Sequence, residues 1–293
     1  MSAGDAPRFD LQSHSTHSDG SLSPAAVVAA AAAAGVELLA LTDHDTVGGV
    51  GEALTAGARL GVTVVPAVEL SAVDADVGEV HVLGYRVDHG DPALAAALED
   101  FRADRARRVR AMAGRLRAAG LELEEGELDR REDAGVPLGR PQLAAAVLSH
   151  PGNRDRLAQE GVVDHDSLFT AYLVPGAPGH VARARPSVSE AVEVVHAAGG
   201  VAAWAHPFWD VSDPGLALDA LRAFAALGVD GVEAFYITHT REQTLLLDAA
   251  AAEHDLLTTG SADFHGPEHE RFNAFRAFEL FGCEPRLGVV AEG

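Results

Sequence analysis

Short apolar segments with strand character alternate along most of this chain with alanine-rich segments of helical character. Helices are expected over residues 24–34, 48–59, 187–198, 216–227 and 241–254, and the apolar runs are FDLQSH, VELLALT, VTVVPAVEL, EVHVLGY, GVAAWAH, VDGVEAFY and LLTTGSAD. Such alternation is typical of parallel strands in a sheet or barrel, because each helix carries the chain back to the start of the next strand. The sequence therefore predicts an α/β protein.

The alternation stops between residues 91 and 176. LEDFRADRARRVRAMAGRLRAAG predicts a charged helix, and a polar, turn-rich stretch follows it. The seven arginines between 102 and 117 are interpreted as a solvated helix face rather than a nucleic-acid site. Residues 91–176 are therefore predicted to form a helical insertion in a discontinuous barrel made of residues 8–90 and 177–285.

Charge limits the classes of partner. The chain has 44 acidic and 22 basic residues, a formal net charge of −22, and no lysine, so every basic residue is arginine. Such a chain repels long nucleic-acid backbones, so no long duplex partner is expected and small anionic substrates remain open. The first residues lack a signal-peptide pattern, no apolar run approaches the roughly 18 residues that cross a bilayer, and a single cysteine, Cys283, supports no disulfide framework. A cytoplasmic location without a membrane partner is expected.

Residues of the kind that bind metals fall at or near the ends of the predicted strands. In parallel sheets and barrels, functional side chains gather at the carboxyl ends of the strands. A single histidine there is usually structural, but repeated coincidence favours a metal site. A mixed set of histidines and carboxylates without cysteine suits Zn²⁺, Mn²⁺ or Fe²⁺ better than Ca²⁺. The candidates are His14, Asp19, Asp43, His44, Asp45, Glu69, His81, His206, Asp263 and His265.

Six ordered motifs, DLQSHSTHSDG, LALTDHDTVGG, VPAVELSA, EVHVLGY, WAHP and SADFHG, resemble the polymerase-and-histidinol-phosphatase (PHP) phosphoesterase family. The resemblance implies a distorted (β/α)₇ barrel with two or three divalent metals, Mn, Zn or Fe with Mg as an option, at its strand ends. Carried over by position, Glu69 bridges two metals, with His14 and Asp263 on one and His81 and His206 on the other, while Asp19, His44 and His265 hold a third. Asp10 and Asp43 are expected to orient neighbouring ligands, and the alternative for either is an ordinary polar residue at a strand end.

The first motif departs from the family pattern. The family usually begins with His-x-His, whereas this chain has Gln12, Ser13 and His14. An amide oxygen is a weak, neutral ligand. Gln12 is therefore expected either to hold its metal loosely or to hydrogen-bond a metal-bound water. His17 is a substitute ligand or a histidine on the pocket rim.

Three further segments, LGRPQLAAAVL, GHVARARPSVSEAV and FYITHTREQ, resemble parts of the substrate pocket in the nucleotide-phosphatase branch of the family. They make Arg140, Arg183, Arg185 and His239 candidates for binding phosphate, and Arg183 and His239 join Glu69 as catalytic candidates. The plainer alternatives are surface arginines and a histidine at a helix start.

The resemblance implies a metal-dependent phosphohydrolase in which a hydroxide bridging two ions attacks phosphorus. Its branch acts on nucleoside 3′,5′-bisphosphates and trims short 5′-phosphorylated RNA, so a small nucleotide or short oligonucleotide is the expected substrate. One alternative is a phosphatase for histidinol phosphate or another small phosphomonoester. An amidohydrolase-type hydrolase is disfavoured because its common bridging lysine is absent. A non-catalytic module with a decayed metal site has only Gln12 in its favour.

Overall fold

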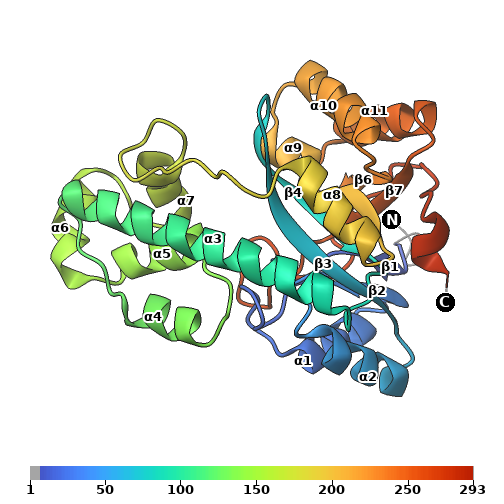
Figure 1. Ribbon diagram of the computed structural model, residues 1–293, viewed down its shortest axis with the longest axis horizontal. Helices are drawn as coiled ribbons and strands as arrows, with labels where there is room; N and C mark the ends of the chain where they lie inside the picture. The colour runs from blue at the N-terminus through green and yellow to red at the C-terminus, as the bar shows by residue number, and fades with distance from the viewer. Residues whose placement is uncertain (1–6, 293) are drawn as a thin grey trace. The chain divides into compact units, whose positions relative to one another are not determined.

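The computed structural model describes residues 7–292 of the chain, and Figure 1 shows its helices and strands. Backbone contacts divide the chain into two compact units. The barrel unit comprises Met1–Leu98 and Pro186–Gly293, and the helical unit comprises Glu99–Arg185. The units meet at 98/99 and 185/186, and the domain boundaries at 90/91 and 176/177 stay a proposal.

The barrel unit is built on one seven-stranded sheet. Neighbouring strands follow each other in chain order from β1 to β7. The sheet comes close to closing, because Leu11 N donates a 3.1 Å hydrogen bond to Gly260 O and Ser13 forms a parallel bridge with Phe264. The predicted α/β barrel is thus confirmed. The strands are β1 Phe9–Asp10, β2 Leu38–Leu41, β3 Thr63–Asp74, β4 Gly78–Tyr85, β5 Val201–Trp204, β6 Gly231–Tyr236 and β7 Leu257–Ser261.

One strand runs against the expected direction. β4 is antiparallel to both of its neighbours, β3 and β5, so the expectation of parallel strands was wrong there. The connection from β3 to β4 is a tight turn with no room for a helix: Asp74 Oδ1 accepts from Val77 N at 3.1 Å, and Gly78 has a φ of 88°. This reversal pairs His81 of β4 with Ser71 of β3. His81 therefore reaches the end of the barrel at which the parallel strands finish.

Helices cover the outside of the barrel, and the five helices predicted for this unit are each found within two residues of their expected ends. α1 and α2 lie side by side, and α8 packs on β3, β4 and β5 (Figure 1). Polar caps start several of them; Ser23 Oγ accepts from Ala26 N ahead of the Pro24 that opens α1. These helices are α1 Pro24–Ala33, α2 Val50–Leu60, α8 Val188–Ala197, α9 Pro207–Asp210, α10 Pro214–Ala226, α11 Arg241–Glu253 and the 3₁₀ helix η3 Gly288–Ala291.

The helical unit has an apolar core of its own, which includes Met112, Leu116, Leu143 and Leu173. Within residues 7–292, no helix is long and apolar enough to cross a membrane. α3 begins in the barrel unit and continues through the helical unit. The elements are α3 Pro92–Ala118, α4 Gly126–Asp133, α5 Arg140–Leu148, η1 Pro151–Asn153, α6 Arg154–Gln159, α7 His165–Leu168 and η2 Phe169–Leu173.

The arginines of α3 only partly form the solvated face expected. Arg105 and Arg108 are buried, and their Nε atoms donate to the carbonyl oxygens of Leu138 at 2.6 Å and Val181 at 2.7 Å. The expectation was wrong for these two residues, which stabilise the unit from within. Arg110 lies on a solvated face as expected, since its partly exposed guanidinium pairs with surface carboxylates.

Candidate metal centre

The eight side chains predicted as metal ligands come together at one end of the barrel unit. They extend from β3 and β4 or from the loops that follow β1, β2, β5 and β7. The candidate ligand atoms of seven of them form three overlapping groups, and within each group all the atoms lie within 4.8 Å of one another. The groups are His14, Asp19, His44 and His265; His44, Glu69 and His81; and His14, Glu69 and Asp263. The eighth, His206, joins the cluster through its ring nitrogen, which lies 3.4 Å from Glu69.

Glu69 lies at the middle of the cluster and is almost fully buried. Its Oε1 lies 2.5 Å from His81 Nδ1 and 3.4 Å from His206 Nε2. Its Oε2 lies 3.1 Å from His14 Nε2 and 3.6 Å from His44 Nδ1. Each oxygen of one carboxylate thus faces two imidazoles. This is the arrangement expected of a carboxylate that bridges two cations.

Asp19 forms a second carboxylate centre on the other side of His14. Its Oδ1 lies 3.5 Å from His265 Nε2 and 3.6 Å from His14 Nδ1. Its Oδ2 lies 3.5 Å from His44 Nε2. The predicted third set contained Asp19, His44 and His265. The geometry adds His14, whose two ring nitrogens face different carboxylates.

The cluster is arranged for cations rather than for internal hydrogen bonds. His14 Nε2, His81 Nδ1 and Asp263 Oδ1 are buried and have no hydrogen-bond partner of acceptable geometry, although each lies close to an oppositely charged group. Buried polar atoms without partners are rare in folded proteins unless a ligand or ion satisfies them. Nitrogen and oxygen atoms that converge in this way match the preferences of Zn²⁺, Mn²⁺ and Fe²⁺. The residues present therefore fit a multinuclear metal centre.

The electrostatics point the same way. Burial by itself would lower the pKa of His14, but the carboxylates of Asp263 and Glu69, 3.0 and 3.1 Å from its Nε2, hold that pKa well above its ordinary value. Burial would raise the pKa of Glu69, but the charges of His44 and His81 keep it well below its ordinary value. The pocket thus favours positive charge beside ionised carboxylates. Metal ions bound there would take the place of protons on the imidazoles.

Two of the candidate ligands, His206 and Asp263, have unusual backbone geometry. His206 and Asp263 have positive φ angles of 29° and 53°, a conformation that costs on the order of 1–3 kcal/mol in a residue other than glycine. Buried partners hold both in place. Glu233 Oε2 accepts from His206 N at 2.9 Å, and Tyr236 OH donates to Asp263 Oδ2 at 2.8 Å. Sequence reasoning missed Glu233 and Tyr236, although a glutamate inside the apolar run VDGVEAFY was a usable signal.

Two further buried carboxylates hold the loops that carry ligands. Asp43 Oδ1 accepts from Ser15 N at 2.7 Å and from Ser18 Oγ at 2.6 Å, which fixes the loop after His14. Asp10 Oδ1 accepts from Ala262 N at 3.0 Å, beside Asp263. Burial raises the pKa of Asp10 to about 7. These contacts are of the kind expected for carboxylates that orient ligands.

Gln12 turns its nitrogen toward the cluster. Its Nε2 donates to Glu69 Oε2 at 2.9 Å, and its Oε1 accepts from Ser261 Oγ at 3.4 Å. An ionised carboxylate only accepts hydrogen bonds, so the amide NH₂ must face Glu69. An amide nitrogen has no lone pair to offer a metal. In this orientation Gln12 is a hydrogen-bond donor that fixes Glu69, and its predicted role as a weak ligand requires the amide to flip.

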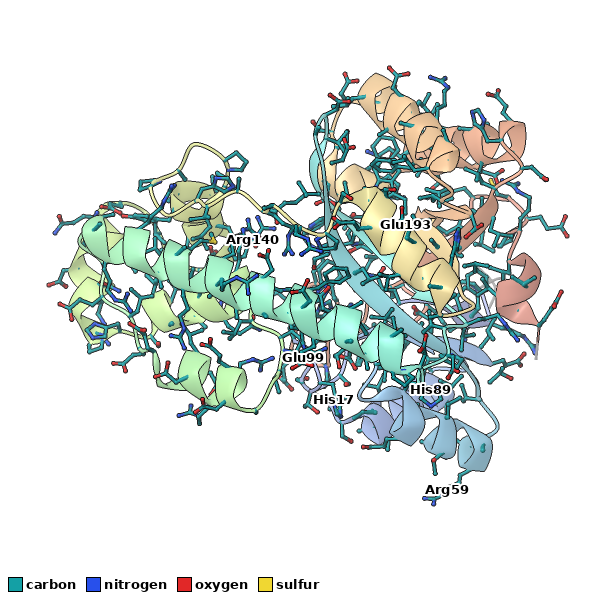
Figure 2. All side chains as sticks on the ribbon, viewed as in Figure 1. His17, Arg59, His89, Glu99, Arg140 and Glu193 are labelled. Atoms are coloured by element: carbon teal, nitrogen blue, oxygen red, sulfur yellow. The ribbon has the colours of Figure 1, made fainter. Side chains whose placement is uncertain are left out.

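His17 and His239 lie outside the three groups found among residues 7–292. Figure 2 shows His17 on the loop between β1 and α1. His239 Nδ1 donates to Ala234 O at 3.1 Å, so its buried Nε2, which has no partner, carries the lone pair. Burial lowers the pKa of His239 to about 4. In this tautomer His239 Nε2 accepts a hydrogen bond, so the expected roles of donating to phosphate or protonating a leaving oxygen, which stay predictions, require the ring to gain a proton.

The three predicted phosphate-binding arginines belong to the helical unit. Arg140 opens α5, and its guanidinium lies 5.5 Å from the ring centroid of Phe169. Arg183 is buried, and Arg185 Nη1 lies 3.1 Å from Asp100 Oδ2. Their role toward phosphate stays a prediction.

Comparison with known proteins places these features in a family. Residues 10–120 match the model of the PHP domain. The chain is 35% identical over 262 residues to a 3′,5′-nucleoside bisphosphate phosphatase of Chromobacterium violaceum, covering 88% of this chain and 87% of the relative. It is 34% identical to a 5′-3′ exoribonuclease of Haemophilus influenzae, covering 89% and 90% of the two chains. It is also 34% identical to a phosphoribosyl 1,2-cyclic phosphate 1,2-diphosphodiesterase of Eggerthella lenta, covering 88% and 94%.

Solved structures agree with the fold. A Chromobacterium violaceum protein described as an amidohydrolase, with bound sulfate and no metal, has a TM-score of 0.80 and 33% identity over 95% of this chain and 94% of its own. A Bifidobacterium adolescentis protein described as a metal-dependent phosphoesterase has a TM-score of 0.74 and 28% identity over 92% and 94% of the two chains.

Proposed function

The chain belongs to the PHP family of metal-dependent phosphoesterases, and from this premise we propose that it removes the 3′-phosphate from nucleoside 3′,5′-bisphosphates. The observation that carries the proposal is the convergence of four histidines on the two oxygens of Glu69. The name of the Chromobacterium relative supports the choice of substrate.

Divalent metals of the Mn, Zn or Fe type, with Mg as an option, would supply Lewis acidity that binds the phosphoryl oxygens and makes water a nucleophile near neutral pH. The chain's own residues would hold them: Glu69 would contribute to two ion positions, and Asp19 to a third. One ion would have His14 and Asp263, the next His81 and His206, and the third His44 and His265. Gln12 keeps the Glu69 carboxylate in one orientation through its 2.9 Å hydrogen bond.

The remaining roles fall to residues that bind substrate or move protons. Arg140, Arg183 and Arg185 are proposed to bind the phosphate that does not react. His239, neutral with its lone pair on Nε2, is proposed to accept a hydrogen bond from the substrate. The net charge of −22 favours a small nucleotide over a long polyanion.

The relative from Haemophilus is named an exoribonuclease, so short RNA with a 5′-phosphate is the second candidate substrate. It shares the chemistry of the bisphosphate, because both carry a 5′-phosphate one nucleotide from the bond that breaks. An amidase activity has less support. The common two-metal amidohydrolase site bridges its ions with a carboxylated lysine, and this chain contains no lysine.

Phosphate release by the purified protein with added Mn²⁺ tests the proposal. The panel contains adenosine 3′,5′-bisphosphate, adenosine 3′-monophosphate, histidinol phosphate and a short 5′-phosphorylated RNA, with a Glu69→Gln preparation as the blank. The bisphosphate is expected to give the highest kcat/KM, because its remote phosphate supplies binding energy that positions the reacting group. A higher value for histidinol phosphate would refute the bisphosphate proposal and leave the family assignment intact.

A further inference from the structure

One large aromatic side chain beside the metal centre is exposed. The chain contains two tryptophans: Trp204 is fully buried, whereas Trp209 is 47% exposed. Among the exposed large apolar side chains of residues 7–292, Trp209 is the only aromatic one. Single exposed apolar residues are ordinary on protein surfaces, so its position and its contacts must decide whether this one has a purpose.

Trp209 is tied to the metal centre along the chain. It lies three residues after the candidate ligand His206, in the short helix α9, and its backbone N donates to His206 O at 2.8 Å. α9 also packs against β4 and β6. The backbone that carries the ring is therefore held by the backbone that carries a ligand.

A second connection runs through aromatic rings. Trp209 packs edge-on against Phe272, with ring centroids 5.6 Å apart. Phe272 in turn lies 5.5 Å from the ring of His265 and 6.2 Å from that of Tyr236, centroid to centroid. The Phe272 carbonyl also accepts from His265 N at 2.9 Å. One intervening ring thus separates the exposed indole from a candidate metal ligand.

A cation accompanies the indole. Arg271 Cζ lies 5.2 Å from the Trp209 ring centroid, within the range of a cation–π contact. Positive charge is scarce in a chain with twice as many acidic as basic residues. At this surface Trp209 therefore presents an aromatic face, and the adjacent Arg271 attracts anions. Nucleotides combine an aromatic base with phosphate, so they match this pairing.

We propose that Trp209, backed by Phe272 and flanked by Arg271, stacks on the base of the nucleotide whose phosphate enters the metal centre. This inference rests on the proposed function and adds that the enzyme recognises nucleosides through the base. Stacking on a single indole accepts any base, because every base has a π face. The subsite therefore selects nucleoside phosphates over aliphatic phosphates without selecting a sequence.

Tryptophan fluorescence tests binding apart from catalysis. Adenosine 5′-monophosphate is titrated into the metal-loaded protein, with glycerol phosphate as the probe that lacks a base. Since Trp204 is buried, the part of the emission that acrylamide quenches reports Trp209. The nucleotide is expected to protect this emission from acrylamide, and glycerol phosphate is not. Equal responses to the two probes would overturn the proposal, whichever substrate the enzyme hydrolyses.

Kinetics give the second test. Trp209→Ala should raise KM for adenosine 3′,5′-bisphosphate by about tenfold or more, and Trp209→Phe should recover most of the loss. The factor by which Trp209→Ala lowers kcat/KM should be about tenfold larger for the bisphosphate than for glycerol phosphate. Leu216→Ala, which truncates a side chain 40% exposed on α10, is the matched control and should behave as wild type. Equal losses on both substrates, or a fall in bound metal, would show that Trp209 only supports His206 and would overturn the stacking proposal.

Discussion

The barrel unit and the helical unit differ in whether their clustered charged side chains find partners within the protein. At the end of the barrel, Glu69 is buried and its two oxygens face four imidazoles, and the facing nitrogens of His14 and His81 lack good hydrogen-bond geometry. In the helical unit, the partly exposed Arg110 lies 2.6 Å from carboxylate oxygens of Asp129 and Glu132 and 3.2 Å from one of Glu125. The first cluster is left incomplete for a ligand, and the second is complete in itself. Substitutions should therefore cost activity in one and a little stability in the other.

The largest effect is expected at Glu69. Glu69→Gln weakens two metal positions at once with little change in volume, so kcat/KM should fall by about 10³-fold, roughly 4 kcal/mol, while the fold remains. Phosphate release measures kcat/KM, and circular dichroism shows whether the fold remains. The control is Glu193→Gln, an exposed residue on α8 (Figure 2), which should turn over normally. Near-normal turnover by a folded Glu69→Gln protein would contradict the bridging role.

Removing a single imidazole should have a smaller effect. His206→Ala, and likewise His81→Ala, should lower bound metal by about one ion and cost roughly 2 kcal/mol or more in transition-state stabilisation. Metal analysis of protein purified without chelator measures the first quantity. His196→Ala provides the control, since His196 is exposed and pairs with Asp230 at 2.8 Å. Unchanged metal content in both test variants would remove these residues from the centre.

The contrast between the two units would weaken if an arginine of the helical unit takes part in the reaction at the end of the barrel. Arg183→Ala, or the same change at Arg140 or Arg185, should lower the preference for a bisphosphate over a simple aryl phosphate by about 1.5–3 kcal/mol, the value of a charge-assisted contact. The ratio of the two kcat/KM values measures it. Arg107→Ala, in an exposed pair with Asp104, is the control. If the ratio stays constant in every variant, the arginines have no part in phosphate recognition.

Substitutions at Gln12 test whether this residue of the barrel cluster positions Glu69 or binds metal. Gln12→Leu removes the hydrogen bond to Glu69, and a loss of about 1–2 kcal/mol in kcat/KM is expected. Gln12→His should raise metal affinity beside His14 and Asp263, because imidazole is a better ligand than an amide. Metal titration of wild type and both variants decides between positioning and ligation. Identical metal binding in wild type and Gln12→His would show that position 12 does not contribute to the coordination sphere.

The smallest effect is expected in the helical unit. Arg110→Met breaks a partly exposed ion-pair network, and such networks contribute about 1 kcal/mol or less to stability. Chemical denaturation should register that loss, and phosphate release should stay at the wild-type rate. A large loss of activity in a stable Arg110→Met protein would mean that the two units do not differ as described.

Local patterns explain what the sequence could predict. Helix ends carry capping residues such as Ser23, strand runs are apolar, and metal-type residues follow them, so the barrel and the cluster could be foreseen. The reversal of β4 depends on the length of one turn, from Asp74 to Gly78, which the alternation of elements does not reveal.

Contacts between distant parts of the chain explain what could not be predicted. The orientation of Gln12 depends on Glu69, 57 residues away. The burial of Arg105 depends on a carbonyl 33 residues later in the chain. Neither partner is identifiable from the residues around Gln12 or Arg105. For the same reason the pattern does not reveal that Trp209 packs on Phe272.

The left-handed backbone at His206 and Asp263 has an evolutionary consequence. Glycine would relieve the strain at either position, so the two ligands are among the residues that selection for stability alone would remove. A lineage that no longer needed the chemistry would lose them early. This chain keeps both, although Gln12 stands where the resemblance to the family leads one to expect a histidine. Two ligands that a stable fold alone would not retain are expected where selection for catalysis continues.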